Sequence, residues 1–177
     1  MNTTQFLFSG FGGQGILFAG KFLAYKGLIE GKEVSWLPSY GPEMRGGTAS
    51  CSVILSDEVV GSPIVSSPDV LVAMNLPSLD RYEKAVVSGG IVFYDSSLID
   101  RKVLRTDIKA IGVPATRLAG ENGIPTLANM ILVGRILKER GEFGESVEKA
   151  LQKVVSAKHP EMLEVNIKAI RLGYDLD

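Results

Sequence analysis

The hydrophobic pattern predicts strands that alternate with helices over the first part of the chain, followed by a helical remainder. Short apolar or alternating runs favour strands at residues 4–9, 34–37, 48–56, 70–75, 91–94 and 110–113. Helices are expected at residues 16–30, 79–87, 115–121, 125–141, 145–158 and 159–173. Residues 57–63 predict a turn with a short returning strand, and hence an inserted antiparallel hairpin.

This order of elements predicts an α/β fold in a single domain spanning residues 1–177. We expect a three-layer α/β/α arrangement with a mixed, mostly parallel sheet, a Rossmann-like beginning and a helical C-terminal part. A chain of this length can bury a substantial core without disulfides or metals.

The helix expected at residues 16–30 is apolar on two opposite faces. One stripe is small and suits close packing on a sheet: Gly20, Ala24 and Gly27. The opposite stripe is bulky: Phe18, Phe22, Tyr25 and Ile29. Such a helix is either enclosed within its own domain or shared with a partner. The pattern slightly favours the partner, because a first helix on an open sheet usually keeps one face in water.

A glycine-rich stretch, Gly10-Phe11-Gly12-Gly13-Gln14-Gly15, lies between the first expected strand and the first expected helix. Its G-x-G-x-x-G spacing is typical of a phosphate-binding turn. Glycines let the backbone approach a ligand, and the helix N-terminus supplies unpaired N–H groups and a partial positive charge. We predict an anion or diphosphate site at Gly10, Gly12, Gly13, Gln14 and Gly15. The alternative is a turn that serves packing alone.

A dinucleotide-binding fold would place an acidic residue at the end of the second strand, about 20 residues past the glycines, to bind the ribose. Here the strand ends in Trp36-Leu37-Pro38-Ser39. The absence of that carboxylate argues against NAD.

A second stretch rich in glycine and proline runs from Ser39 to Gly47, with the sequence SYGPEMRGG. This composition predicts a loop. Arg45 suits bidentate binding of a phosphate or carboxylate, although it can equally pair with Glu43 and only hold the loop. Ligand contacts are expected from Ser39, Tyr40, Gly41, Arg45, Gly46 and Gly47.

Polar residues also follow two later strands. Asn75 ends one apolar run, and Asp95-Ser96-Ser97 ends the next. Ligands of open α/β sheets gather at the carboxyl ends of strands, so Asn75 is a candidate ligand residue. Its alternative role is to cap the helix that follows.

Composition excludes several classes of protein. The net charge of −1 argues against nucleic-acid binding, because a binder needs bulk positive charge to neutralise phosphates. No apolar stretch of the ~18 residues that a membrane span requires is present. A single cysteine and the lack of a secretory leader predict the cytoplasm.

The sequence also argues against independent catalysis by this chain. Cys51 alone cannot hold an iron–sulfur cluster, and it is expected to be a core residue. His159 is the single histidine; it has no acidic cluster for a metal site and no G-x-S-x-G elbow for a hydrolase triad. We expect no catalytic residue and no metal ligand.

The glycine turn, the WLPSYGPEMRGGT stretch of residues 36–48 and the strand end at 69–77 together resemble the gamma subunit of 2-oxoacid:ferredoxin oxidoreductases. The similarity extends over nearly the whole chain, including His159-Pro160-Glu161. The second motif is closer to the 2-oxoglutarate and branched-chain members than to the pyruvate members.

The resemblance implies a subunit of a complex that oxidatively decarboxylates a 2-oxoacid, reduces ferredoxin and releases an acyl-CoA. It implies that thiamine diphosphate, Mg and iron–sulfur clusters belong to the alpha, beta and ferredoxin-like delta subunits. It further implies that this chain completes the coenzyme A site, which suits the phosphates expected at Gly10–Gly15 and Arg45. A stand-alone nucleotide-binding dehydrogenase and a purely structural subunit stay open as alternatives, and the indolepyruvate oxidoreductases have a similar subunit.

Overall fold

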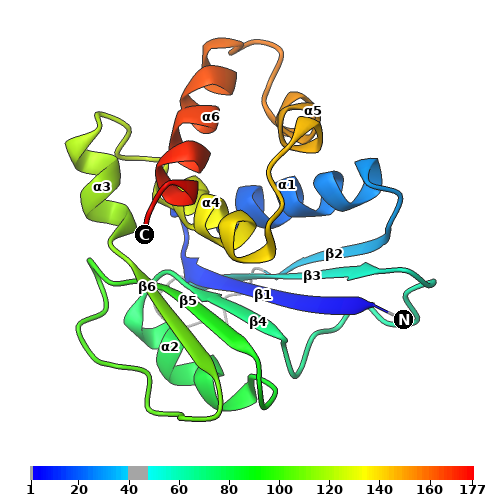
Figure 1. The fold of residues 1–177 in the computed structure, drawn as a ribbon, viewed down its shortest axis with the longest axis vertical. Coiled ribbons are helices and arrows are strands. Elements are labelled where there is room, and N and C mark those ends of the chain that lie inside the picture. The colour runs from blue at the N-terminus through cyan, green and yellow to red at the C-terminus, as the bar shows by residue number, and fades with distance from the viewer. Residues whose placement is uncertain (1, 40–47) are drawn as a thin grey trace.

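The computed structural model describes residues 2–39 and 48–177, and within them a six-stranded sheet forms the centre of the fold (Figure 1). The strand order is β2-β3-β1-β4-β5-β6. The strands are β1 (Thr3–Phe11), β2 (Glu33–Ser39), β3 (Thr48–Ser56), β4 (Val70–Ala73), β5 (Ile91–Asp95) and β6 (Lys109–Val113). These strands match the six apolar runs of the sequence, so the predicted mixed α/β fold is confirmed.

Helices cover both faces of this sheet. They are α1 (Ile16–Ile29), α2 (Leu76–Tyr82), the 3-10 turn η1 (Glu83–Ala85), α3 (Ala115–Glu121), α4 (Ala128–Arg140), α5 (Glu145–Val154) and α6 (Glu161–Tyr174). Figure 1 shows α2 beneath the sheet and α1 and α4 above it, with α5 and α6 stacked farther out. Two separate hydrophobic clusters fill the two sides of the sheet, as a layered α/β fold requires. Helices α5 and α6 lie outside α1 and α4 and form a further layer beyond the three that the sequence predicted.

The sheet departs from a Rossmann fold at β3. This strand is antiparallel to both of its neighbours, β1 and β2, whereas β1, β4, β5 and β6 are mutually parallel. β3 therefore occupies the place beside β1 where a dinucleotide-binding fold has its second parallel strand. The end of β2 lies two strands away from β1, so a ribose-binding carboxylate would not belong there.

The antiparallel hairpin expected at residues 57–63 was placed wrongly. Residues 57–69 contain no strand, and the antiparallel pairing instead joins β2 to β3 and β3 to β1. Alternation within β3 identified it as a strand, but its direction depends on pairing with distant strands, which periodicity does not encode.

Helix α1 lies between the sheet and α5. Its small stripe packs on β3: a Cβ added to Gly20 would overlap the Cys51 Sγ atom, and one added to Gly27 would lie 2.5 Å from the Leu55 Cδ2 atom. The expected close packing is thus confirmed.

The bulky stripe of α1 is only partly covered. On that side α5 contacts the helix, and Phe22 is fully buried. Phe18 and Tyr25 are half-buried, however, and Ile29 is exposed. Both the enclosed and the partner-facing alternatives therefore stay open.

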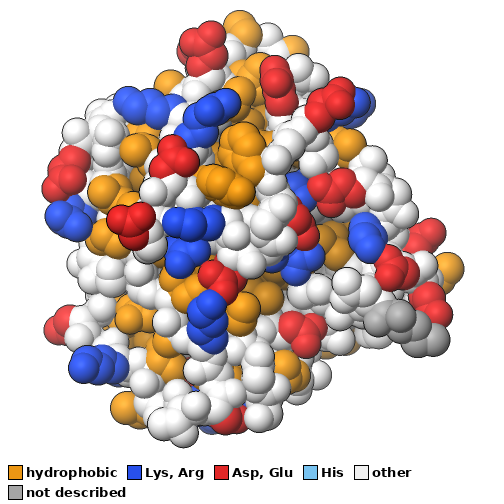
Figure 2. Space-filling model, in the orientation of Figure 1, with side chains coloured by type: hydrophobic (Ala, Val, Ile, Leu, Met, Phe, Trp, Pro, Cys, Tyr) orange, Lys and Arg blue, Asp and Glu red, His pale blue; other side chains and the backbone are white. Residues whose placement is uncertain are grey.

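Acidic and basic side chains alternate over the face of the molecule shown in Figure 2. Many charged side chains of the described chain form ion pairs, such as Arg101 with Asp80 and Glu83. Among the described residues, no helix is long and apolar enough to cross a membrane.

Candidate functional site

The glycine-rich stretch forms an exposed turn between the carboxyl end of β1 and the start of α1. Phe11, Gly12 and Gly13 are exposed, and Gly13 and Gly15 have positive φ angles of 90° and 74°. Residues other than glycine rarely adopt such φ angles, which explains glycine at these two positions. The bend predicted from the glycine spacing is therefore present, and it is open to solvent.

The N-terminus of α1 faces this bend without a side-chain cap among the described residues. Gly15 occupies the N-cap position, and the first turn of the helix carries no acidic residue. Such a terminus offers unpaired N–H groups and the positive end of the helix dipole. A cavity of about 260 Å³ lies against it and is lined by Phe11, Gly12, Gly13, Gly15, Ile16, Leu17, Phe18 and Ala49. The arrangement suits an anion that accepts hydrogen bonds from backbone N–H groups.

Gln14 braces the turn. Its Oε1 atom accepts a hydrogen bond of 2.7 Å from the Phe11 N–H, and its Nε2 atom donates one of 3.1 Å to the Met74 carbonyl oxygen. Gly10 makes room for this side chain, because a Cβ at Gly10 would lie 2.6 Å from Gln14 Oε1. Gln14 and Gly10, both candidate ligand residues, thus have a structural role in shaping the turn.

The second glycine-rich stretch begins beside this turn. Ser39 is the last residue of β2 and pairs with Ser50, while Thr48 begins β3 and pairs with Phe11 of the glycine turn. Both ends of the 40–47 segment therefore lie at the edge of the sheet that carries the turn. The candidate residues Tyr40, Gly41, Arg45, Gly46 and Gly47 lie outside the described part of the chain, and their assignment stays a prediction.

The polar residues after β4 and β5 have structural roles. Asn75 is the N-cap of α2: its Oδ1 atom accepts a 2.8 Å hydrogen bond from the Ser78 N–H, and the residue is only 2% exposed. Asp95 is fully buried and accepts hydrogen bonds from the Thr116 N–H and hydroxyl at the start of α3. The capping alternative therefore describes Asn75, and its role as a ligand residue stays a prediction.

Cys51 lies fully buried in the middle of β3, beneath α1. Burial raises the pKa of its thiol to about 12, because the low-dielectric core disfavours the thiolate. The thiolate is the reactive form, so the side chain is inert in the folded protein. Within the described residues, no group of three or more His, Cys, Asp or Glu side chains is placed to hold a metal ion.

We expect Cys51 to react with an aromatic disulfide reagent only when the chain opens or unfolds. Near neutral pH the native protein should show almost no release of the reagent's chromophore, and one equivalent should appear in concentrated guanidinium chloride. Rapid labelling of the native protein would contradict the buried position of this thiol.

Sequence reasoning missed Asn129, in the first turn of α4. Its Nδ2 atom donates a 3.0 Å hydrogen bond to the Gly15 carbonyl oxygen, which fixes the start of α1 against α4. A Cβ at Gly15 would lie 2.8 Å from the Asn129 Cγ atom, so this approach is a second reason for glycine there. An asparagine in the apolar first half of the helix was the signal that the sequence offered.

Fold and site together define an α/β domain with a glycine-rich, anion-accepting turn at the first helix. A comparison with protein families identifies which such domain this is. The chain belongs to the pyruvate ferredoxin/flavodoxin oxidoreductase family, whose model matches residues 5–176. The family predicted from the glycine motifs is confirmed.

Individual relatives agree with this assignment. The chain is 44% identical over 170 residues to the ketoisovalerate oxidoreductase subunit VorA of Methanothermobacter marburgensis, a match that covers 94% of this chain and 35% of VorA. The chain thus spans about a third of that relative. It also resembles the solved gamma subunit of a keto/oxoacid ferredoxin oxidoreductase from Geobacter sulfurreducens, with 29% identity, a TM-score of 0.82 and coverage of 97% and 96% of the two chains.

A third similarity concerns the fold. The chain superposes with a TM-score of 0.87 and 22% identity on a 2-oxoglutarate:ferredoxin oxidoreductase from Magnetococcus marinus, whose structure holds 2-oxoglutarate, coenzyme A and succinyl-CoA. The superposition covers all of this chain and 32% of that one. The same fold therefore occurs both as a separate subunit and as part of a longer chain.

Proposed function

We propose that this chain is a gamma-type subunit of a 2-oxoacid:ferredoxin oxidoreductase that completes the coenzyme A site of the complex and performs no catalysis alone. Its substrate class is 2-oxoglutarate or a branched-chain 2-oxoacid, and it works in the cytoplasm. The observation that carries the proposal is the exposed bend at Gly12 and Gly13 in front of the start of α1, which has no side-chain cap among the described residues.

The phosphates of coenzyme A fit the chemistry of this turn. A diphosphate accepts hydrogen bonds from backbone N–H groups and is favoured at the positive end of a helix dipole. Ser39 and Thr48 hold the ends of the 40–47 segment at the same edge, within reach of a ligand on the turn. Arg45 of that segment would add a bidentate contact to a phosphate.

The division of labour follows from what this chain contains. Its single cysteine is buried and inert, and its sequence has no Gly-Asp-Gly thiamine motif, so iron–sulfur clusters and thiamine diphosphate would belong to alpha, beta and delta subunits. The contribution of this chain is to position coenzyme A: holding the thiol carrier beside the reacting intermediate removes an entropic cost of about 7 kcal/mol or more at best. The coenzyme A held by the Magnetococcus protein of the same fold supports this role.

Gly13→Asp tests the proposal in the assembled complex. A Cβ at Gly13 meets nothing within 4 Å, and the strain of a non-glycine residue at a φ of 90° costs about 1–3 kcal/mol, so the variant should still fold and place a carboxylate at the phosphate position. We expect the KM for coenzyme A to rise at least about tenfold through charge repulsion. Decarboxylation of the 2-oxoacid without coenzyme A should stay nearly unchanged. Steady-state ferredoxin reduction at varied coenzyme A concentration measures both.

Gly89→Asp is the matched control. Gly89 has a similar φ of 80° and equally open surroundings, but it precedes β5, at the opposite edge of the sheet from the carboxyl end of β1. Its substitution carries the same backbone strain without approaching the turn. Equal coenzyme A kinetics in the two variants would contradict the proposal and favour a turn that serves packing alone.

A further inference from the structure

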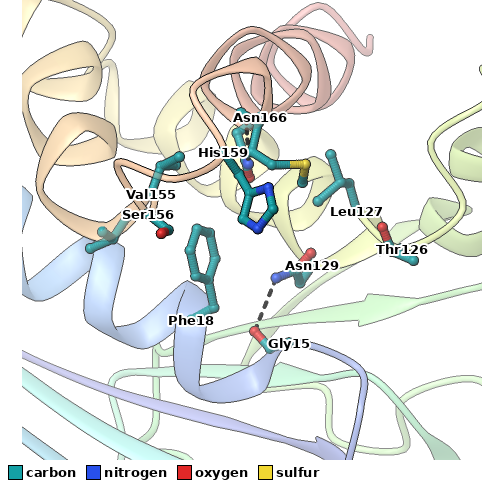
Figure 3. A pocket seen from close by; sticks show the side chains of 11 residues that line it. Gly15, Phe18, Thr126, Leu127, Asn129, Val155, Ser156, His159 and Asn166 are labelled. Carbon is teal, nitrogen blue, oxygen red and sulfur yellow. Dashed lines mark hydrogen bonds between the residues drawn. The ribbon is translucent and has the colours of Figure 1, made fainter.

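Asn129 joins the start of α4 to the glycine turn (Figure 3). The residue is 3% exposed, and its Nδ2 atom donates a 3.0 Å hydrogen bond to the Gly15 carbonyl oxygen. The same oxygen accepts a second hydrogen bond of 3.0 Å, from the Ala19 N–H of α1. The Gly15 carbonyl group is therefore held both by its own helix and by a helix that is distant in sequence.

This carbonyl belongs to the peptide group whose N–H is that of Ile16, the first residue of α1. Because a peptide group is planar, fixing its oxygen also fixes the direction of the Ile16 N–H. Hydrogen bonds accepted by a carbonyl polarise the group and strengthen its N–H as a donor. Gly15 and Ile16 both line the cavity of about 260 Å³ at the turn, and the Ile16 N–H has no backbone partner among the described residues. The Ile16 N–H is thus a fixed and strengthened donor at the open end of α1.

We propose that Asn129 is a positioning residue for coenzyme A: through the Gly15 carbonyl, it holds the Ile16 N–H in the direction in which that group donates to a phosphate oxygen. The inference rests on the function proposed for the glycine turn. Asn129 does not line the cavity at the turn, so it acts through the backbone and not by touching the ligand.

The amide group of Asn129 adds little net stability to the fold. Its Oδ1 atom is buried and has no hydrogen-bond partner within the described chain. A buried acceptor without a donor lowers stability by as much as a hydrogen bond typically adds, or by more. Leucine would fill nearly the same volume without that acceptor. A variant that lacks the amide should therefore fold, and its effect should appear in coenzyme A binding.

Asn129→Leu and Asn129→Ala test the inference in the assembled complex. Leucine keeps the volume and alanine removes it, so an effect common to both comes from the lost donor. We expect the KM for coenzyme A to rise about three- to tenfold in both variants, the usual range for one hydrogen bond, with kcat at saturating coenzyme A nearly unchanged. In ¹⁵N-resolved NMR of the full chain, the Ile16 amide proton should move upfield, because its N–H is less polarised.

Asn166→Leu is the matched control. Asn166 on α6 is 2% exposed, its Oδ1 atom also lacks a partner in the described chain, and its Nδ2 atom donates 2.7 Å to the Met162 carbonyl oxygen of its own helix. Both asparagines line a second cavity, of about 360 Å³, but the bond of Asn166 does not reach the turn. This variant should keep the KM for coenzyme A and the Ile16 signal of the unaltered protein.

Gly13→Asp separates this inference from the proposed function. If Gly13→Asp raises the KM for coenzyme A and the two Asn129 variants do not, the turn binds coenzyme A without Asn129, and the inference alone is wrong. If the KM is unchanged in Gly13→Asp as well, the proposed function fails and the inference fails with it. An equal rise in Asn166→Leu would also overturn the inference, because a general disturbance of the helices would then explain the effect.

Discussion

Alanine at Gly134 or at Gly173 is expected to lower the free energy of unfolding by about 3 kcal/mol or more, the upper part of the range for overpacked cores. These glycines let α4 and α6 touch backbone to backbone. A Cβ at Gly134 would overlap the Ile170 carbonyl oxygen and lie 2.8 Å from its carbon. A Cβ at Gly173 would meet the Ile131 carbonyl group in the same way. Backbone atoms cannot rotate aside, so the two helices would have to separate.

Urea unfolding followed by circular dichroism measures this effect, and Gly120→Ala is the control. Gly120 lies within α3, and an added Cβ there meets nothing within 4 Å. That substitution should be neutral or stabilise by up to about 1 kcal/mol, since alanine favours a helix over glycine. The double variant at Gly134 and Gly173 should lose less free energy of unfolding than the two single variants added together, because either alanine already separates the helices. If the free energy of unfolding of Gly134→Ala lies within about 1 kcal/mol of that of the unaltered protein, the backbone contact between α4 and α6 is not tight.

Lys26→Met is the second substitution with a large expected effect. We expect it to lower the free energy of unfolding by about 2–4 kcal/mol at neutral pH. The Lys26 side chain is 2% exposed, and its Nζ atom lies 2.6 Å from Glu30 Oε1 and 2.8 Å from Glu142 Oε2. Removing the ammonium leaves the partly buried Glu30 carboxylate without its ion-pair partner, and Glu142 with Arg140 alone. The contact also joins α1 to the segment between α4 and α5, so its loss should loosen α5 from α1.

This loss should shrink on acidification. Burial tends to raise the pKa of Glu30, but hydrogen bonds from Lys26 and Ser146 and the charges of Lys26 and Arg140 outweigh it, and the pKa lies below its usual 4.5. A lowered carboxyl pKa stabilises the fold above the unfolded value of 4.5, and that stability is lost as the pH falls through the folded pKa. Acid therefore removes the ion pair from the unaltered protein and neutralises the Glu30 carboxylate, which has no ion-pair partner in the variant.

Unfolding curves from neutral pH down through the glutamate range measure this convergence. Lys149→Met is the control, because Lys149 forms an i,i+4 pair with Glu145 on the exposed side of α5, where the two side chains are 54% and 80% exposed. Exposed ion pairs contribute little to stability, so the free energy of unfolding of Lys149→Met should differ from that of the unaltered protein by less than about 0.5 kcal/mol. An equal loss in the two variants would show that burial adds nothing to the Lys26 contact.

Most elements of the fold were predictable because their signals are local. Periodicity placed all six strands, and Gly141 correctly marked the end of α4, whereas the helix begins at Ala128 and not at the predicted Pro125. The glycine spacing identified the bend before α1, where the structure shows positive φ at Gly13 and Gly15. The direction of β3 was not predictable in this way, and the hairpin was therefore assigned to the wrong residues. Pairing depends on strands distant in sequence, and a strand's own pattern is the same in either direction.

The sequence by itself determined the order of elements and the glycine turn at the start of α1, since both follow from residue type and spacing along the chain. Its resemblance to a known family gave membership of the oxidoreductase family. The tertiary structure alone decided that α5 covers part of α1, that Asn75 is a helix cap and that two distant glycines bring α4 against α6. It also brought Asn129 and Asn166 to one cavity. These are contacts between residues far apart in sequence, and only the packing of the whole chain fixes which atoms meet and which polar atoms are left without a partner.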